Sequence, residues 1–142
     1  MFTDYSRYIC LMKKPNKEQT VIPFSITVIA VLMIIFGLAE VITGFTHYFF
    51  GLTTSQATLS TYIGVALGGC YFIGGVFLLT KNKWAASIAI GLLTVDVIGR
   101  IGMVITGLYP VNTLLQISGI AIGTIIAAFF AIYVGLKLKY FK

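Results

Sequence analysis

The sequence has very few charged and metal-binding residues. Only 10% of its 142 residues are charged, only four are acidic, and it has one histidine and two cysteines. With 58% hydrophobic residues, this composition excludes an ordinary soluble domain and predicts an all-α integral membrane protein of one domain. A single histidine excludes a haem held by two histidines of the chain, and no Cys/His spacing typical of a metal site occurs. We therefore expect no metal and no cofactor.

The net charge of +6 does not indicate nucleic-acid binding, because the basic residues form no patch on a polar surface. They lie at the edges of the hydrophobic runs, where lysine and arginine set topology and contact anionic lipid. We expect the lipid bilayer as partner and no nucleic acid. Cys10 lies in a polar segment and Cys70 within a hydrophobic run, so the two are too far apart in depth to form a disulfide.

Four hydrophobic runs are long enough to cross a bilayer, which takes about 20 residues of helix. They cover residues 21–48, 59–80, 84–108 and 111–136. Each should be an α-helix, because lipid offers the backbone no other hydrogen-bond partners. The connections are short, which makes neighbouring helices antiparallel. Residues 21–142 are therefore predicted to form an up-down four-helix transmembrane bundle.

The basic residues outside the membrane core all fall on one side of this bundle. They precede the first run, fill the second connection and follow the fourth run, at Arg7, Lys13, Lys14, Lys17, Lys81, Lys83, Lys137, Lys139 and Lys142. The connections at 49–58 and 109–112 carry no charge. The positive-inside rule then predicts that both termini are cytoplasmic, in a protein of the cell membrane.

The N-terminal segment, residues 1–20, is expected to be a cytoplasmic tail. Phe2, Tyr5, Ile9 and Met12 recur at helical spacing, as in an amphipathic helix lying on the membrane surface. A partly ordered tail fits the same residues, and both interpretations stay open.

An internal duplication is indicated when the sequence is aligned with itself at a shift of about 56 residues. Glu40 then falls on Asp96, and at a shift of 55 Gly64-xxx-Gly68 falls on Gly119-xxx-Gly123. We interpret this as two related helical hairpins, a parallel repeat about an axis along the membrane normal. The alternative is coincidence, since two hairpins of the same orientation share basic loops and small-residue motifs. The four glycines are also predicted to let helices pack closely, within the bundle or in a homodimer.

Three ionisable residues lie inside the hydrophobic runs: Glu40 in the first, and Asp96 and Arg100 in the third. A charge at such depth costs several kcal/mol unless it is paired, hydrated or neutralised. Asp96 and Arg100 share a helix face through their i, i+4 spacing, and Glu40 shares a face with His47. From the helical rise, all three charges and Gln116 reach the outer half of the membrane. We therefore predict a polar cluster of Glu40, Asp96, Arg100 and Gln116. His47 is either a residue of the outer membrane interface or an outward extension of a proton path from this cluster.

Two acids against one base leave one acid without a counter-charge. Such an acid is neutralised by a proton or holds a cation or water. The leading hypothesis is therefore that the protein binds or moves a small solute, cation or proton through this cluster. A second hypothesis is an accessory or structural subunit of a larger membrane complex, with the charges as internal ion pairs. An intramembrane enzyme is disfavoured, because no nucleophile–base pair or cofactor motif can be found. The identity of a ligand and the oligomeric state do not follow from the sequence.

Overall fold

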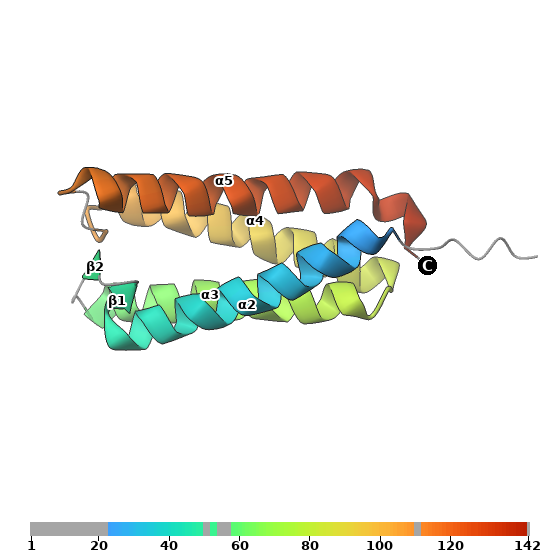
Figure 1. Cartoon of the computed structure of the whole chain (residues 1–142), viewed down its shortest axis with the longest axis horizontal. Coiled ribbons are helices and arrows are strands. Elements are labelled where there is room, and N and C mark those ends of the chain that lie inside the picture. Colours follow the sequence, from blue (N-terminus) through green and yellow to red (C-terminus); the bar gives the residue numbers. More distant parts are fainter. Residues whose placement is uncertain (1–22, 50–51, 54–57, 110–111, 142) are drawn as a thin grey trace, which may run out of the picture.

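The chain folds into a bundle of four long helices, as Figure 1 shows. The structure, a computed structural model, describes residues 23–49, 52–53, 58–109 and 112–141. The long helices are α2 (Phe24–Thr46), α3 (Thr58–Leu79), α4 (Lys83–Ile105) and α5 (Leu114–Leu136). All four are long and apolar enough to cross a membrane, with mean hydropathies of 1.9 to 2.5. The predicted all-α membrane protein with a four-helix bundle is confirmed.

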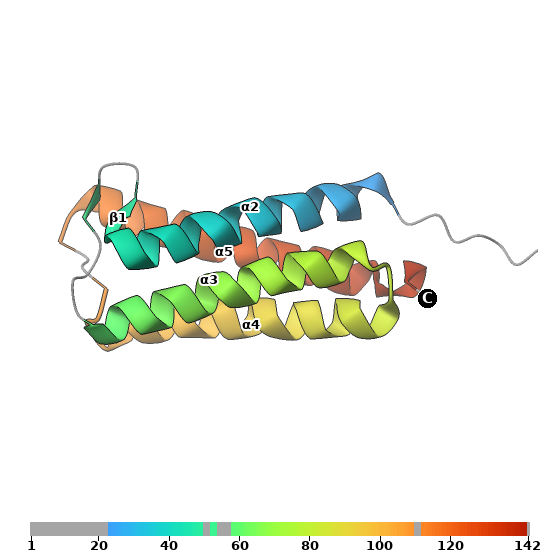
Figure 2. The same cartoon turned by 90° about the horizontal axis from the view of Figure 1, so that it is seen from below.

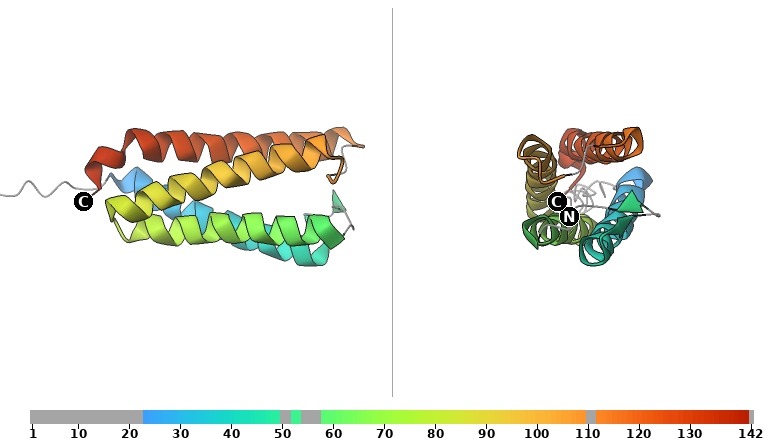
Figure 3. Two further views of the ribbon diagram at one scale, coloured as in Figure 1. Left: turned by 180° about the vertical axis from the view of Figure 1, so that it is seen from behind. Right: turned by 90° about the vertical axis from the view of Figure 1, so that its left-hand side faces the viewer.

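Successive helices run antiparallel, so the bundle has two distinct ends (Figure 2). Seen along its long axis, the helices occupy the corners of a square (Figure 3). We call the end with Pro23, the α3–α4 connection and Phe141 the terminal end. We call the opposite end, with His47 and Tyr109, the distal end.

The first helix is shorter than the predicted run of 21–48, because a strand pair follows it directly. Residue His47 ends α2 in the left-handed conformation, with φ of 60°. The strand β1 (Tyr48–Phe49) then pairs antiparallel with β2 (Leu52–Thr53), with Tyr48 opposite Thr53. The predicted N-terminal amphipathic helix lies outside the described residues.

The remaining helix ends follow local signals of the sequence. Asn82 precedes α4 and accepts a hydrogen bond from the Trp84 amide at 2.9 Å. At the other end of α4, Gly107 has a φ of 70°, a conformation that glycine adopts without strain. The third helix boundary therefore falls at Ile105 and not at the predicted 108. A short 3₁₀ helix, η1 (Leu138–Tyr140), follows α5.

The backbones of α2 and α3 lie in close contact along a row of glycines. A Cβ atom on Gly37 would lie 2.8 Å from the carbonyl oxygen of Gly68. A Cβ on Gly68 would lie 2.8 Å from the amide nitrogen of Val41, and one on Gly75 the same distance from the Ala30 oxygen. Side chains larger than hydrogen do not fit there, so glycine permits this approach. The contact fixes the position of Glu40, which neighbours Val41.

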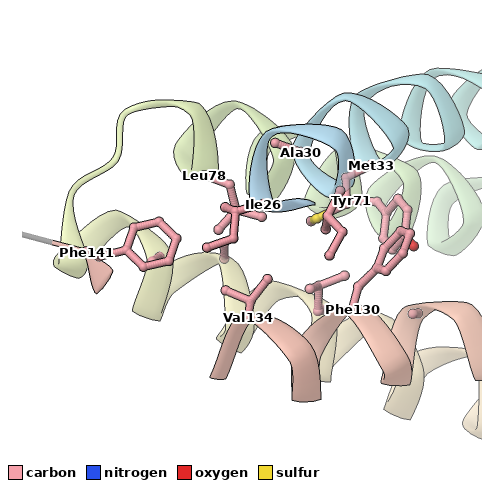
Figure 4. Close-up of a cluster of buried hydrophobic side chains, with 13 residues drawn as sticks. Ile26, Ala30, Met33, Tyr71, Leu78, Phe130, Val134 and Phe141 are labelled. Carbon is pink, nitrogen blue, oxygen red and sulfur yellow. The ribbon is translucent and has the colours of Figure 1, made fainter. Parts of the chain in front are cut away.

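The apolar core fills the terminal half of the bundle (Figure 4). All four helices contribute, and Phe141 lies at the terminal end of the core, at the left of the view. The labelled side chains are Ile26, Ala30, Met33, Tyr71, Leu78, Phe130, Val134 and Phe141. At the same level the hydroxyl groups of Ser25 and Tyr133 hydrogen-bond at 2.7 Å and join α2 to α5.

The distal half is packed differently. The buried residues of α5 are Ala127, Phe130 and Val134, all in its terminal half. Figure 1 shows α2 close to α5 at the terminal end and diverging from it toward the distal end. The polar residues of the hydrophobic runs therefore lie where the bundle is less tightly closed.

Candidate functional site

The three charged residues of the hydrophobic runs meet in one cluster. The Nη2 atom of Arg100 lies 2.5 Å from Glu40 Oε2, and its Nε atom lies 3.0 Å from Asp96 Oδ2. Both contacts are charge-assisted hydrogen bonds. One guanidinium thus holds two carboxylates, one on its own helix and one on α2. We call these three residues the ion triad.

The triad lies toward the distal end. At 1.5 Å per residue, Glu40 stands about 24 Å along α2 and Asp96 about 20 Å along α4 from their terminal ends. Asp96 and Arg100 are one helical turn apart, so the same face of α4 presents both. The close α2–α3 backbone contact holds Glu40 against this face.

The members of the triad differ in exposure. The side chain of Asp96 is fully buried, whereas 19% of Glu40 and 14% of Arg100 remain accessible. The second oxygen of Asp96, Oδ1, is buried without a hydrogen-bond partner among the described residues. Glu40 is therefore the acid that a proton or ligand can reach, and Asp96 is the enclosed one.

A small pocket leads from the distal end to Glu40. It offers about 30 Å³ of space for water-sized groups. One water needs about 10–15 Å³ on this measure, so the pocket has room for about two. Its lining comes from α2, α3, α4 and the segment after α4: Glu40, Thr43, Gly44, His47, Ser60, Thr61, Gly64, Met103 and Tyr109. We call this the distal pocket.

Most of the polar atoms that line the distal pocket are carboxylate and hydroxyl oxygens. The Ser60 side chain is 8% exposed and has no hydrogen-bond partner among the described residues. The Thr43 hydroxyl donates to the Ala39 carbonyl at 2.7 Å, which leaves its lone pairs able to accept. Thr61 adds a further hydroxyl. Together with Glu40, these groups can bind a cation or a chain of water molecules.

Tyr109, in the segment that follows α4, lines the distal pocket and interacts electrostatically with Glu40 and Arg100. Burial raises the pKa of its phenol, and the negative carboxylate of Glu40 raises this pKa further, while Arg100 opposes the shift. Tyr109 therefore stays a neutral hydrogen-bonding group at all physiological pH values.

The other predicted site residues have separate positions. His47 lines the distal pocket, two turns beyond Glu40 on α2. Gln116, predicted with the cluster, closes a capping box at the start of α5. Its Oε1 accepts hydrogen bonds from the amides of Asn112 and Thr113, both at 3.2 Å. This side chain therefore stabilises the first turn of α5.

The four predicted packing glycines have unequal surroundings. Gly68 touches the α2 backbone. A Cβ atom on Gly64 would lie 4.0 Å from the Cα atom of Gly44. A Cβ on Gly123 would lie 3.1 Å from Arg100 Nη1, so this glycine makes room for the guanidinium. A Cβ on Gly119 would have no atom within 4 Å in the described part of the chain.

Sequence reasoning missed several residues of the distal pocket, above all Ser60, Thr61 and Tyr109. One signal was available on α2, where Glu40, Thr43, Gly44 and His47 form a stripe of polar or small residues at helical spacing. No comparable signal exists for Ser60, because its place opposite this stripe depends on how α3 is registered against α2.

The described residues contain no cluster of acidic, histidine and cysteine side chains of the kind that holds a divalent metal. No group of three or more His, Cys, Asp or Glu side chains comes together within them.

Comparisons with protein families, with curated proteins and with solved structures each found no match. Within the described residues, the candidate site consists of the ion triad and the distal pocket, which lies between Glu40 and the distal end.

Proposed function

We propose that this membrane protein binds and releases a proton at Glu40, through the distal pocket, as part of proton or cation movement across the membrane. The observation that carries the proposal is the contact of one carboxylate with both a buried arginine and a polar pocket. A purely structural ion pair does not need such a pocket.

The charge balance of the triad supports an exchangeable proton. With all three groups ionised, the cluster carries a net charge of −1 in a low-dielectric setting, because Arg100 is the one basic residue in contact with both acids. One excess charge at this depth is unfavourable by several kcal/mol. Binding one proton or one monovalent cation makes the cluster neutral.

Glu40 is the acid that takes up this charge. Asp96 is enclosed, and its Oδ2 is held by Arg100. Glu40 lines the pocket, so protons reach it without crossing packed side chains. Protonation weakens its bond to Arg100, which then pairs with Asp96 alone.

Infrared difference spectroscopy of the protein in lipid nanodiscs tests the proposal. A protonated carboxyl group has a C=O band that a carboxylate lacks, so a pH titration should show one such band appear as the pH falls. The band should be absent in Glu40→Gln. A parent protein whose carboxyl bands between pH 4 and 9 match those of Glu40→Gln would rule the proposal out.

The sidedness of the pocket follows from the basic residues. Among the described residues outside the triad, the basic ones are Lys81, Lys83, Lys137 and Lys139, all at the terminal end. Under the positive-inside rule, that end faces the cytoplasm and the distal pocket faces outward.

Thiol labelling tests this orientation. In a chain without Cys10 and Cys70, a cysteine at the exposed position Asn112 should react with an impermeant reagent added to intact cells. A cysteine at Lys83, equally exposed at the terminal end, should react only after lysis. Reaction at position 83 alone would invert the orientation.

A second candidate function is that of a structural subunit in a larger membrane complex. The observation in its favour is that Arg100 joins α2 and α4 through two ion pairs, which is enough to hold the bundle together. In that case Glu40 stays in one protonation state over the whole pH range, and the infrared titration separates the two functions.

A further inference from the structure

We infer that the distal pocket is a binding site for a small monovalent alkali cation such as Na⁺, and that this cation competes with the proton for Glu40. This inference rests on the proposed function and names the second ion of the same site.

The donor atoms of the pocket match a hard cation. The walls supply a carboxylate at Glu40 and hydroxyl oxygens at Ser60, Thr61 and Thr43. Carboxylate, hydroxyl and water oxygens suit hard cations, whereas thiolate and imidazole suit softer metals. The pocket thus offers oxygen ligands from two helices to an ion lying above Glu40.

Ser60 is the strongest single indication of a ligand. This residue is 8% exposed and lines the pocket, and its hydroxyl has no hydrogen-bond partner among the described residues. Asp96 Oδ1 is the one enclosed polar side-chain atom without a partner in the described part of the chain, so the Ser60 oxygen is open to the pocket. A lone pair of this oxygen would coordinate a bound cation, and a water on that cation would accept the hydroxyl hydrogen.

Size and charge limit the cation to a monovalent one. Space for about two water-sized groups admits Na⁺ with one water and excludes a large organic cation. The triad carries a net charge of −1, which one positive charge neutralises. A divalent ion would bring an excess positive charge beside Arg100, and the described residues place no third carboxylate there.

Several titratable groups surround Glu40. Those that interact with it electrostatically or line the same pocket are Arg100 and Asp96 on α4, Tyr71 on α3, Tyr109 after α4 and His47 at the end of α2. Tyr71 and Tyr109 are neutral phenols, and Arg100 is permanently charged. Glu40 therefore remains the place where a proton and Na⁺ exclude each other.

The infrared titration of the Glu40 carboxyl band, repeated in different salts, tests the inference. The comparison uses NaCl, KCl, methylammonium chloride and N-methylglucamine chloride at one ionic strength. With Na⁺ at about ten times its Kd for the deprotonated site, the pH midpoint should be about one unit lower than in N-methylglucamine.

Ser60→Ala should reduce the Na⁺-dependent shift by at least half while the band itself still titrates. Ser87→Ala is the matched control, because Ser87 is exposed at the terminal end and donates to the Lys83 carbonyl. Thr61→Val offers a second pocket variant should Ser60→Ala fail to fold.

The outcomes separate the inference from the proposed function. A titrating band whose midpoint is the same in all four salts overturns the cation site and leaves the proton site standing. A shift in methylammonium but not in Na⁺ also overturns it, in favour of an organic ammonium ligand. The absence of a titrating band that depends on Glu40 rejects the proposed function.

Discussion

Replacement of Arg100 by methionine should destabilise the bundle in a manner that depends on pH. The parent triad needs one proton or cation to become neutral, because it holds two acids and one base. Without the guanidinium, the two acids need two protons or cations to become neutral. Methionine keeps much of the length of the side chain, so the change mainly removes the charge and its two hydrogen bonds.

The magnitude follows from the cost of the second proton. A carboxyl group with a pKa near 4 in the unfolded chain takes up a proton at pH 7 at a cost of about 4 kcal/mol. Removing the guanidinium also relieves its own desolvation, so we expect a net loss of about 2–4 kcal/mol, in the range for breaking a buried ion pair. The native variant binds one more proton than the native parent. Its extra instability therefore grows by about 1.4 kcal/mol per pH unit above pH 4 and is smallest below pH 4.

Reversible unfolding in mixed micelles, measured from pH 4 to 8, gives these free energies. Glu40→Gln is the first control, because it leaves Arg100 and Asp96 as a neutral pair that needs no extra proton. Lys83→Met removes an exposed cation and should change stability by less than about 0.5 kcal/mol. An Arg100→Met variant with the parent's stability and pH profile would refute the idea that this arginine neutralises the two acids.

Two further predictions concern packing and electrostatics. Gly68→Leu should disrupt the α2–α3 contact and lower the unfolding midpoint, because even a Cβ there lies 2.8 Å from the Val41 amide nitrogen. Gly119→Leu, where a Cβ meets no atom within 4 Å in the described part of the chain, should change that midpoint little, and equal effects would contradict the packing account. Glu40→Gln should lower the pKa of the Tyr109 phenol, because the negative charge that helps to raise it is gone. Carbon-13 NMR of labelled tyrosine measures this pKa, and an unchanged value would mean that Glu40 carries no charge near Tyr109.

The fold could be predicted from the sequence because hydropathy and backbone hydrogen bonding alone determine transmembrane helices. The meeting of Glu40, Asp96 and Arg100 also follows from the sequence, since their depths agree and unpaired charges are unfavourable in lipid. Each of these inferences needs only the position of a residue along its own helix.

The distal pocket could not be predicted in the same way, because it depends on the rotation and register of α3 against α2. Glycine contacts such as Gly37 with Gly68 set that register, and fifteen glycines offer too many alternatives for hydropathy to choose among. Gln116 illustrates a missed local signal. The spacing from Thr113 to Gln116 matches a capping box, which the structure shows. The membership of Gln116 in the polar cluster stays a prediction. The internal repeat stays a prediction.

The accessibility of position 40 tests the central claim most directly, namely that Glu40 lies at the end of an open polar pocket. Glu40→Cys is made in a chain without Cys10 and Cys70, and Ag⁺, a thiol reagent small enough for a pocket with space for about two water-sized groups, is added to the distal side of sealed vesicles. Ile42→Cys is the control, since Ile42 is 60% exposed on the apolar surface of the same helix, where lipid keeps a thiol protonated and unreactive. We predict rapid modification of Glu40→Cys, detected by intact mass, and none of Ile42→Cys. Equal resistance of both cysteines would show that the triad is a dry ion pair and contradict the account.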